Sequence, residues 1–251
     1  MKNLKRIYFD IETSMVEGRF WRIGRKIDLS PDNITKPAQI ICICYKWEHE
    51  DKVHALTWDR KHQDKKMLKD FIQVANEADE LVAHNGKGFD MKWVLWECLI
   101  NSIPAFPTYK MVDTLSMMRT KFRAPSNRLN YLCQVLFGKE KTPHSGLQLW
   151  HDVMDNVPGA LDQMVSYCKN DVLLLEELFL TIEGYFPAKT NNAVLSGYEK
   201  WCCPYCTESD VKHSKVRVTA MGSVRHQMQC NSCKRYFTIS ATDYNKFLER
   251  N

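Results

Sequence analysis

The chain has 251 residues, of which 44% are hydrophobic and 26% are charged, and its formal net charge at pH 7 is +5. This length suits one large domain, or one domain with a small appendage. Apolar runs fall short of the ~20 residues of a membrane-spanning helix, and the first residues, MKNLKRIYFD, reach a carboxylate too early for a secretory signal. We therefore expect a cytoplasmic protein in a reducing compartment, and not a membrane or secreted one.

The first sixty residues are rich in β-branched and aromatic side chains. Their spacing predicts three strands, at 4–12, 38–47 and 52–58. The stretch 13–37 between the first two strands is predicted to be irregular. It carries basic and aromatic residues: Phe20, Trp21, Arg22 and Arg25.

Strands and helices alternate in the next part of the chain. Apolar residues at helical spacing predict helices over 65–78 and 89–100, and short strands are predicted over 79–85 and 109–115. Three further helices are then predicted, over 114–122, 128–137 and 160–183. This order predicts an α/β domain with a mixed sheet flanked by helices.

The first predicted strand runs from an apolar segment into two carboxylates, in the sequence YFDIETS. Side chains alternate between the faces of a strand, so Asp10 and Glu12 share one face and Ile11 points to the other. Two like charges so close repel each other unless a cation lies between them. A divalent metal ion is one candidate, and it would need further ligands from other parts of the chain.

Three other aspartates are candidate partners. Two glycines in HNGKGFD allow a tight turn before Asp90 opens a helix, although an acidic residue there is also a common helix N-cap. In SYCKND, Tyr167 and Asp171 are four residues apart and share one helix face, a pair that alone is usually structural. The third candidate, Asp113, is left outside the predicted ligand set.

In this order, FDIET, HNGKGFD and YCKND resemble the three motifs of the DEDD superfamily of 3′–5′ exonucleases. The resemblance covers roughly residues 4–186 and implies a ribonuclease-H-like fold. The tyrosine places it with the tyrosine branch, and the second motif is closest to the proofreading domains of family B DNA polymerases. The matching residues are Asp10, Glu12, Asn85, Phe89, Asp90, Tyr167 and Asp171.

The resemblance implies a site with two Mg²⁺ or Mn²⁺ ions, which suit hard carboxylate oxygens. Asp10 would bridge both ions, Glu12 and Asp171 would hold the ion that activates water, and Asp90 would hold the second ion. Tyr167 would orient the water. The expected activity is the release of nucleoside monophosphates from 3′ ends, with single-stranded DNA favoured over RNA. The alternatives are RNA 3′-end trimming and a catalytically silent nucleic-acid-binding module.

The second motif also supplies expected substrate contacts at Asn85, Lys87 and Phe89. Lys87 would contact phosphate, and Phe89 would stack on a terminal base, as Phe20 and Trp21 would. Exposed lysines are mostly just solvated, however, and for Phe89 packing in the core is favoured over stacking on a base. His84, next to the motif, is expected to be structural because the tyrosine already fills the place of a histidine.

Ten cysteines are present, and four of them form two C-x-x-C pairs near the C-terminus, separated by 23 residues. This spacing is typical of a structural Zn²⁺ bound by four thiolates, as in a zinc ribbon. The predicted ligands are Cys203, Cys206, Cys230 and Cys233. Cys202 could in principle replace Cys203, but the two-residue spacing to Cys206 favours Cys203. His213 and His226 are expected to be spectators in a loop. The remaining cysteines are expected to be buried.

Three segments are predicted on these grounds: an exonuclease domain at 1–187, a linker at 188–200 and a zinc ribbon at 201–251 with a short C-terminal helix. From Tyr198 to Asn251, nine Lys or Arg stand against five Asp or Glu, which leaves a local charge of +4. This basic segment predicts an anionic partner. DNA is the favoured partner, and docking of a replication or repair protein is the alternative.

Overall fold

The structure is a computed structural model that describes residues 4–21, 30–105, 108–139 and 146–250. The chain divides into two compact units. The N-terminal unit is Arg6–Phe179, and the C-terminal unit is built mainly from residues 180–250.

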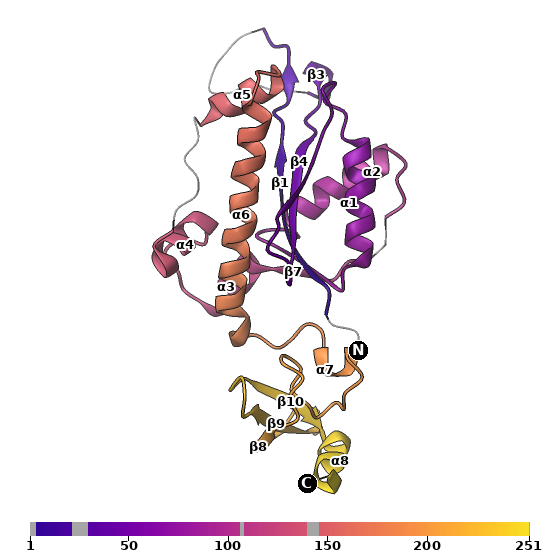
Figure 1. The fold of residues 1–251 in the computed structure, drawn as a ribbon, viewed down its shortest axis with the longest axis vertical. Coiled ribbons are helices and arrows are strands. Elements are labelled where there is room, and N and C mark those ends of the chain that lie inside the picture. Colours follow the sequence, from indigo (N-terminus) through magenta and orange to yellow (C-terminus); the bar gives the residue numbers. More distant parts are fainter. Residues whose placement is uncertain (1–3, 22–29, 106–107, 140–145, 251) are drawn as a thin grey trace. The chain divides into compact units, whose positions relative to one another are not determined.

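A five-stranded mixed sheet forms the centre of the N-terminal unit, in the order β5-β4-β1-β6-β7 (Figure 1). β1 is antiparallel to β4 and parallel to β6, and β6 is parallel to β7. The five strands are β1 (Arg6–Thr13), β4 (Ile40–Trp47), β5 (His54–Thr57), β6 (Glu80–Ala83) and β7 (Met111–Asp113). All five strands expected from the sequence are therefore present, which confirms the predicted fold class.

Between β1 and β4, the stretch expected to be irregular contains a short antiparallel pair, β2 (Glu17–Gly18) and β3 (Ile34–Lys36), with a 3-10 turn η1 at Pro31–Asn33. Residues 22–29, which include the predicted Arg22 and Arg25, lie outside the described residues.

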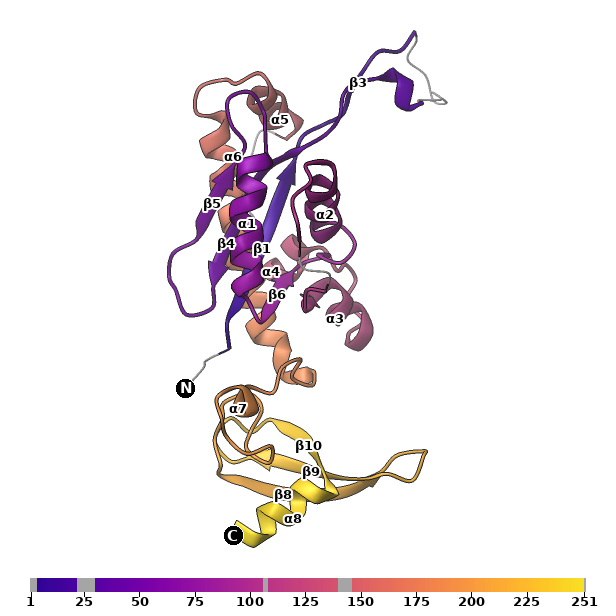
Figure 2. The same cartoon turned by 90° about the vertical axis from the view of Figure 1, so that its right-hand side faces the viewer.

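Helices cover both faces of the sheet. They are α1 (Lys65–Glu77), α2 (Asp90–Ile100), α3 (Thr114–Lys121), α4 (Leu129–Phe137), α5 (Leu147–Met154) and α6 (Ala160–Ile182). Figures 1 and 2 show α6 on one face and α1 with α2 on the other. Helix α5 is not among the helices predicted from the sequence.

The alternation of β1 divides its side chains between these two layers. Phe9 and Ile11 belong to the core shared with α1 and α2, where the rings of Phe9 and Phe71 are 5.2 Å apart. Tyr8 faces α6, with its ring 5.8 Å from that of Phe179. By the same alternation, Asp10 faces α6.

A buried pair of carboxyl groups lies on the side of the sheet that α1 and α2 cover. Glu97 on α2 is 1% exposed, and Asp64, which precedes α1, is 2% exposed. Burial, followed by the charge of Asp64, raises the pKa of Glu97 to about 7. A protonated Glu97 can donate a hydrogen bond to the Asp64 carboxylate, and this bond opposes the rise that burial causes in the pKa of Asp64.

We expect this pair to make stability fall with rising pH. In the unfolded chain Glu97 loses its proton near 4.5, whereas in the folded protein it keeps the proton to about 7. The free energy of unfolding therefore decreases as pH rises from 4.5 to about 7. Glu97→Gln keeps a donor without titrating, so it should be more stable than the parent at pH 8.5 by roughly 1–2 kcal/mol. Urea unfolding at pH 5 and pH 8.5 measures this difference, with the exposed Glu77→Gln as control. Parallel pH profiles for Glu97→Gln and the parent would contradict it.

The C-terminal unit contains a three-stranded antiparallel sheet in the order β10-β9-β8. Its elements are η2 (Glu183–Tyr185), α7 (Asn192–Leu195), β8 (Val211–Val218), β9 (Val224–Cys230), β10 (Tyr236–Ser240) and α8 (Ala241–Arg250). Helix α7 lies within the stretch expected as a linker, and its Ala193 is fully buried in one core with Trp201 and Met228. No helix among the described residues has the length and apolar character needed to cross a bilayer.

Candidate active site

Three carboxylates from β1 and α6 meet on one side of the sheet. Ligand oxygens of Asp10, Glu12 and Asp171 all lie within 4.8 Å of one another. Asp171 is only 3% exposed, whereas Asp10 and Glu12 are partly exposed. Negative charges this close repel in a partly buried setting, so the arrangement favours a bound cation.

Tyr167 lies one helical turn before Asp171 on α6 and is 8% exposed. Residues four apart share a helix face, so the tyrosine faces the same layer as the carboxylate.

The structure does not bring Asp90 into this group of three. Asp90 opens α2, is 2% exposed and accepts hydrogen bonds from its own N–H and from that of Ile11, the residue between Asp10 and Glu12. Burial is the main reason why its pKa rises to about 7, and the charge of Asp113 adds to this rise. Within the described part of the chain, its Oδ1 atom has no hydrogen-bond partner.

These observations fit a hard divalent cation. Three clustered carboxylates supply oxygen ligands, and a buried carboxylate oxygen without a hydrogen-bond partner lies on the residue beside them. That Asp90 holds a second ion stays a prediction.

Asp113, at the end of β7, holds the loop of the second motif. Its carboxylate accepts hydrogen bonds from the backbone N–H groups of Asn85, Lys87 and Ser116, at 3.2, 3.1 and 3.1 Å. The Ser116 bond caps α3, and the other two fix the turn that leads to Asp90.

Glycine is favoured in that turn because an added side chain would crowd its neighbours. A Cβ added to Gly86 would lie 2.6 Å from the side chains of Ala83 and Met111, and one added to Gly88 would lie 2.5 Å from Oδ1 of Asn85. Asn85 itself has a φ of 75°, a conformation that asparagine tolerates better than most residues.

His84 makes two hydrogen bonds through its ring. Nε2 donates to the carbonyl of Asn127 at 2.8 Å, and Nδ1 lies 2.9 Å from the hydroxyl of Thr114. With both nitrogens engaged, the geometry supports the structural role expected for this histidine.

The remaining predicted substrate contacts are at the surface. Lys87 is exposed, and Phe89 is 39% exposed with its ring 6.3 Å from that of Trp93. The favoured expectation that Phe89 packs in the core is therefore wrong. Phe20 and Trp21 are also exposed.

A cavity of about 490 Å³ opens beside the carboxylates. Asp10 and Asp171 line it together with three polar residues before and at the start of α4: Asn127, Arg128 and Asn130. These three residues were not predicted from the sequence, although the polar run PSNRLN before a predicted helix could have indicated them. An exposed arginine next to clustered carboxylates can bind a substrate phosphate.

Three cysteines lie next to the clustered carboxylates. In the register of β1 and β4, Cys44 pairs with Asp10 and Cys42 with Glu12, so these side chains share a face. Cys168 on α6 completes a buried group of three thiols. Burial raises the pKa of Cys168 well above its ordinary value, so the thiol stays protonated, and it donates to Oδ2 of Asp10 at 3.7 Å. These cysteines are buried, as expected.

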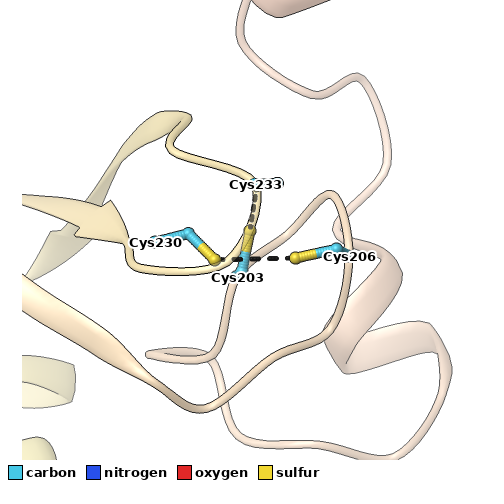
Figure 3. A group of neighbouring side chains, drawn as sticks. All are labelled: Cys203, Cys206, Cys230 and Cys233. Atoms are coloured by element: carbon cyan, nitrogen blue, oxygen red, sulfur yellow. Dashed lines mark hydrogen bonds between the residues drawn. The ribbon is translucent and has the colours of Figure 1, made fainter.

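In the C-terminal unit, the four predicted cysteines come together (Figure 3). The Sγ–Sγ distance is 3.6 Å between Cys203 and Cys233, and also between Cys206 and Cys230. A tetrahedral Zn²⁺ with Zn–S bonds of ~2.3 Å separates its sulfurs by about 3.8 Å, so the group fits this ion. Cys202 lies outside the group, as predicted.

His213 and His226 also lie outside this group, but they are not in a loop as expected. They lie on β8 and β9, where their ring nitrogens are 3.3 Å apart. The ring of His226 stacks on Tyr244 of α8 at 3.8 Å. The two histidines thus pack the sheet against the helix.

Comparison with known proteins bears on both fold and activity. Residues 51–154 match the family model RNase_T, described as Exonuclease. This range includes Asp90 but neither β1 nor α6. No curated protein matches the chain.

Among solved structures, the family B DNA polymerase from the hyperthermophilic archaeon Pyrobaculum calidifontis is similar, with a TM-score of 0.55 and 15% sequence identity. The match covers 73% of this chain and 25% of the polymerase, so the matched part of this chain spans about a quarter of that protein. The family match over residues 51–154 supports a nuclease. The structural similarity supports the ribonuclease-H-like fold.

Proposed function

We propose that this chain is a metal-dependent 3′–5′ exonuclease that removes nucleoside monophosphates from single-stranded DNA. The observation that carries the proposal is the convergence of Asp10, Glu12 and Asp171 from β1 and α6 within 4.8 Å. The exonuclease-family match over residues 51–154 supports the same chemistry.

Asp10, Glu12 and Asp171 would hold Mg²⁺ or Mn²⁺, with Asp90 as a further ligand. When bound, a pair of such ions activates water and stabilises the charge on the leaving oxygen of a phosphodiester. Tyr167 would orient the attacking water through its hydroxyl, because an ordinary tyrosine pKa near 10 makes it a poor base at neutral pH.

Other side chains would hold the substrate. Arg128, which lines the cavity beside the carboxylates, would bind a phosphate of the strand. Asn85, Lys87 and Phe89 would contact the terminal nucleotides from the loop that Asp113 fixes. We further propose that Cys203, Cys206, Cys230 and Cys233 bind one structural Zn²⁺.

The test uses oligonucleotides of DNA and of RNA, each labelled at the 3′ end or at the 5′ end. We expect 5′-labelled DNA to shorten stepwise, and 3′-labelled DNA to release its label as a mononucleotide at once. RNA oligonucleotides of the same sequence, assayed in parallel, show whether the enzyme prefers DNA or RNA. Shortening from the 5′ end, or internal cuts, would contradict the proposed polarity.

Metal dependence needs a separate design, since a chelator also removes Zn²⁺ from a cysteine site. The protein is therefore gel-filtered without chelator and assayed with no addition, with Mg²⁺, with Mn²⁺ or with Ca²⁺. We expect activity with Mg²⁺ or Mn²⁺ only. Full activity with no added metal would contradict the proposed mechanism.

A further inference from the structure

A groove of about 910 Å³ lies on the C-terminal unit. Its walls come from the segment 184–188, the first cysteine knuckle, and strands β8, β9 and β10 with the turn before β10. None of the described residues that line it is an aspartate or a glutamate.

Aromatic rings are concentrated in this groove. Tyr185 and Tyr236 line it and are 64% and 52% exposed, which is unusual for such large apolar surfaces. Tyr205 is fixed beside them, because its hydroxyl donates to the carbonyl of Phe186 at 2.8 Å. The exposed rings of Tyr185 and Tyr236 offer flat faces on which bases can stack.

Cations accompany the rings. Lys200, Arg217, Lys234 and Arg235 line the same groove. The Arg235 guanidinium lies 5.0 Å from the centre of the Tyr205 ring and pairs with Glu183 at 2.8 Å, so it is held in place. Glu183 offsets one of these charges, and the lining stays basic.

The register of the sheet extends this basic surface. Arg217 pairs across the strands with Arg225, and Lys215 pairs with Gln227, which places these side chains on one face. Tyr236 pairs with Gln229 on the same face. The opposite face is covered by α8, where Tyr244 stacks on His226 (Figure 2).

From this combination we infer that the groove binds single-stranded nucleic acid, with bases stacked on Tyr236 and Tyr185 and phosphates bound by Arg217 and Lys200. Rings and cations without carboxylates complement a strand that exposes its bases and carries one charge per nucleotide. The inference deepens the proposed function, on which it rests for the biological role of the strand. Docking of a protein segment is the competing occupant.

The experiment measures binding and hydrolysis separately. Fluorescence anisotropy follows fluorescein-labelled oligo(dT) and oligo(U) in the Asp171→Asn background without added Mg²⁺ or Mn²⁺, so that the strand stays intact. Tyr236→Ala should weaken binding about ten-fold, whereas Tyr236→Phe should bind like the parent. Arg217→Gln should weaken binding several-fold and lower the slope of log affinity against log salt by ~0.7.

Tyr198→Ala and Lys246→Gln are matched controls, because both residues are exposed in the same unit but do not line the groove. They should leave binding unchanged. Each variant is first checked for the zinc content of the parent. Unchanged affinity in both Tyr236→Ala and Arg217→Gln would overturn the inference and leave the groove to a protein partner.

Failure of the exonuclease proposal would look different. The p-nitrophenyl ester of thymidine 5′-monophosphate is too small to occupy the carboxylate site and the groove at once. Its hydrolysis therefore reports only on the carboxylate site. Loss of groove binding should leave this hydrolysis unchanged. If the protein binds DNA in the groove but hydrolyses neither the ester nor DNA, the exonuclease proposal is refuted and the inferred binding groove stands.

Discussion

Asp171→Asn should abolish nuclease activity and leave the protein at least as stable as the parent. The substitution replaces a charged ligand by a neutral amide, which binds Mg²⁺ and Mn²⁺ poorly, so we expect a loss of about 10³-fold or more. It also removes one of three negative charges that lie within 4.8 Å of one another. The metal-free variant should therefore gain stability, on the order of 1 kcal/mol.

Two measurements separate this result from simple misfolding. Thermal unfolding without metal should show the variant melting at or above the parent. Added Mn²⁺ should raise the Tm of the parent, because it binds only the folded state, and should raise that of the variant less. Asp162→Asn, an exposed aspartate on the same helix, is the matched control and should keep parental activity. An Asp171→Asn variant that retains activity would remove the basis of the proposed mechanism.

Local periodicity was enough to predict the parts of this site that lie on single elements. The strand period of two placed Asp10 and Glu12 on one face, and the four-residue spacing on α6 placed Tyr167 with Asp171. The mixed sheet followed from the order of the elements, and the similarity to the polymerase structure supports it. Each of these signals lies within a few residues of sequence.

What could not be predicted depends on contacts between distant residues. Asp113 receives backbone hydrogen bonds from residues 28 and 26 positions earlier, and no local pattern indicates such a bond. The thiols of Cys42 and Cys44 lie next to the carboxylates only because of the register between β1 and β4. For Asp90 the motif was recognised in the sequence. Only the structure shows that this residue lies outside the cluster of three carboxylates.

Loss of the bound metal from the cysteine cluster should unfold the C-terminal unit and spare the N-terminal unit. The core of the C-terminal unit is small, and two of its fully buried residues, Cys203 and Cys230, are themselves in the cluster. Structural Zn²⁺ contributes roughly 10–16 kcal/mol of binding free energy in zinc-finger peptides. A core of this size cannot replace such a contribution.

Cys230→Ser should therefore lower the zinc content well below about one ion per chain and open the segment after residue 188 to proteolysis. The fragment resistant to protease should retain Mg²⁺-dependent hydrolysis of the thymidine ester, because the three carboxylates belong to the other unit. Cys202→Ser is the matched control: its thiol is buried beside the cluster but is not part of it, so zinc content and protease resistance should persist. Protein that is isolated without zinc, or that resists protease equally with and without it, would show that the four thiols are a packing feature and not a metal site.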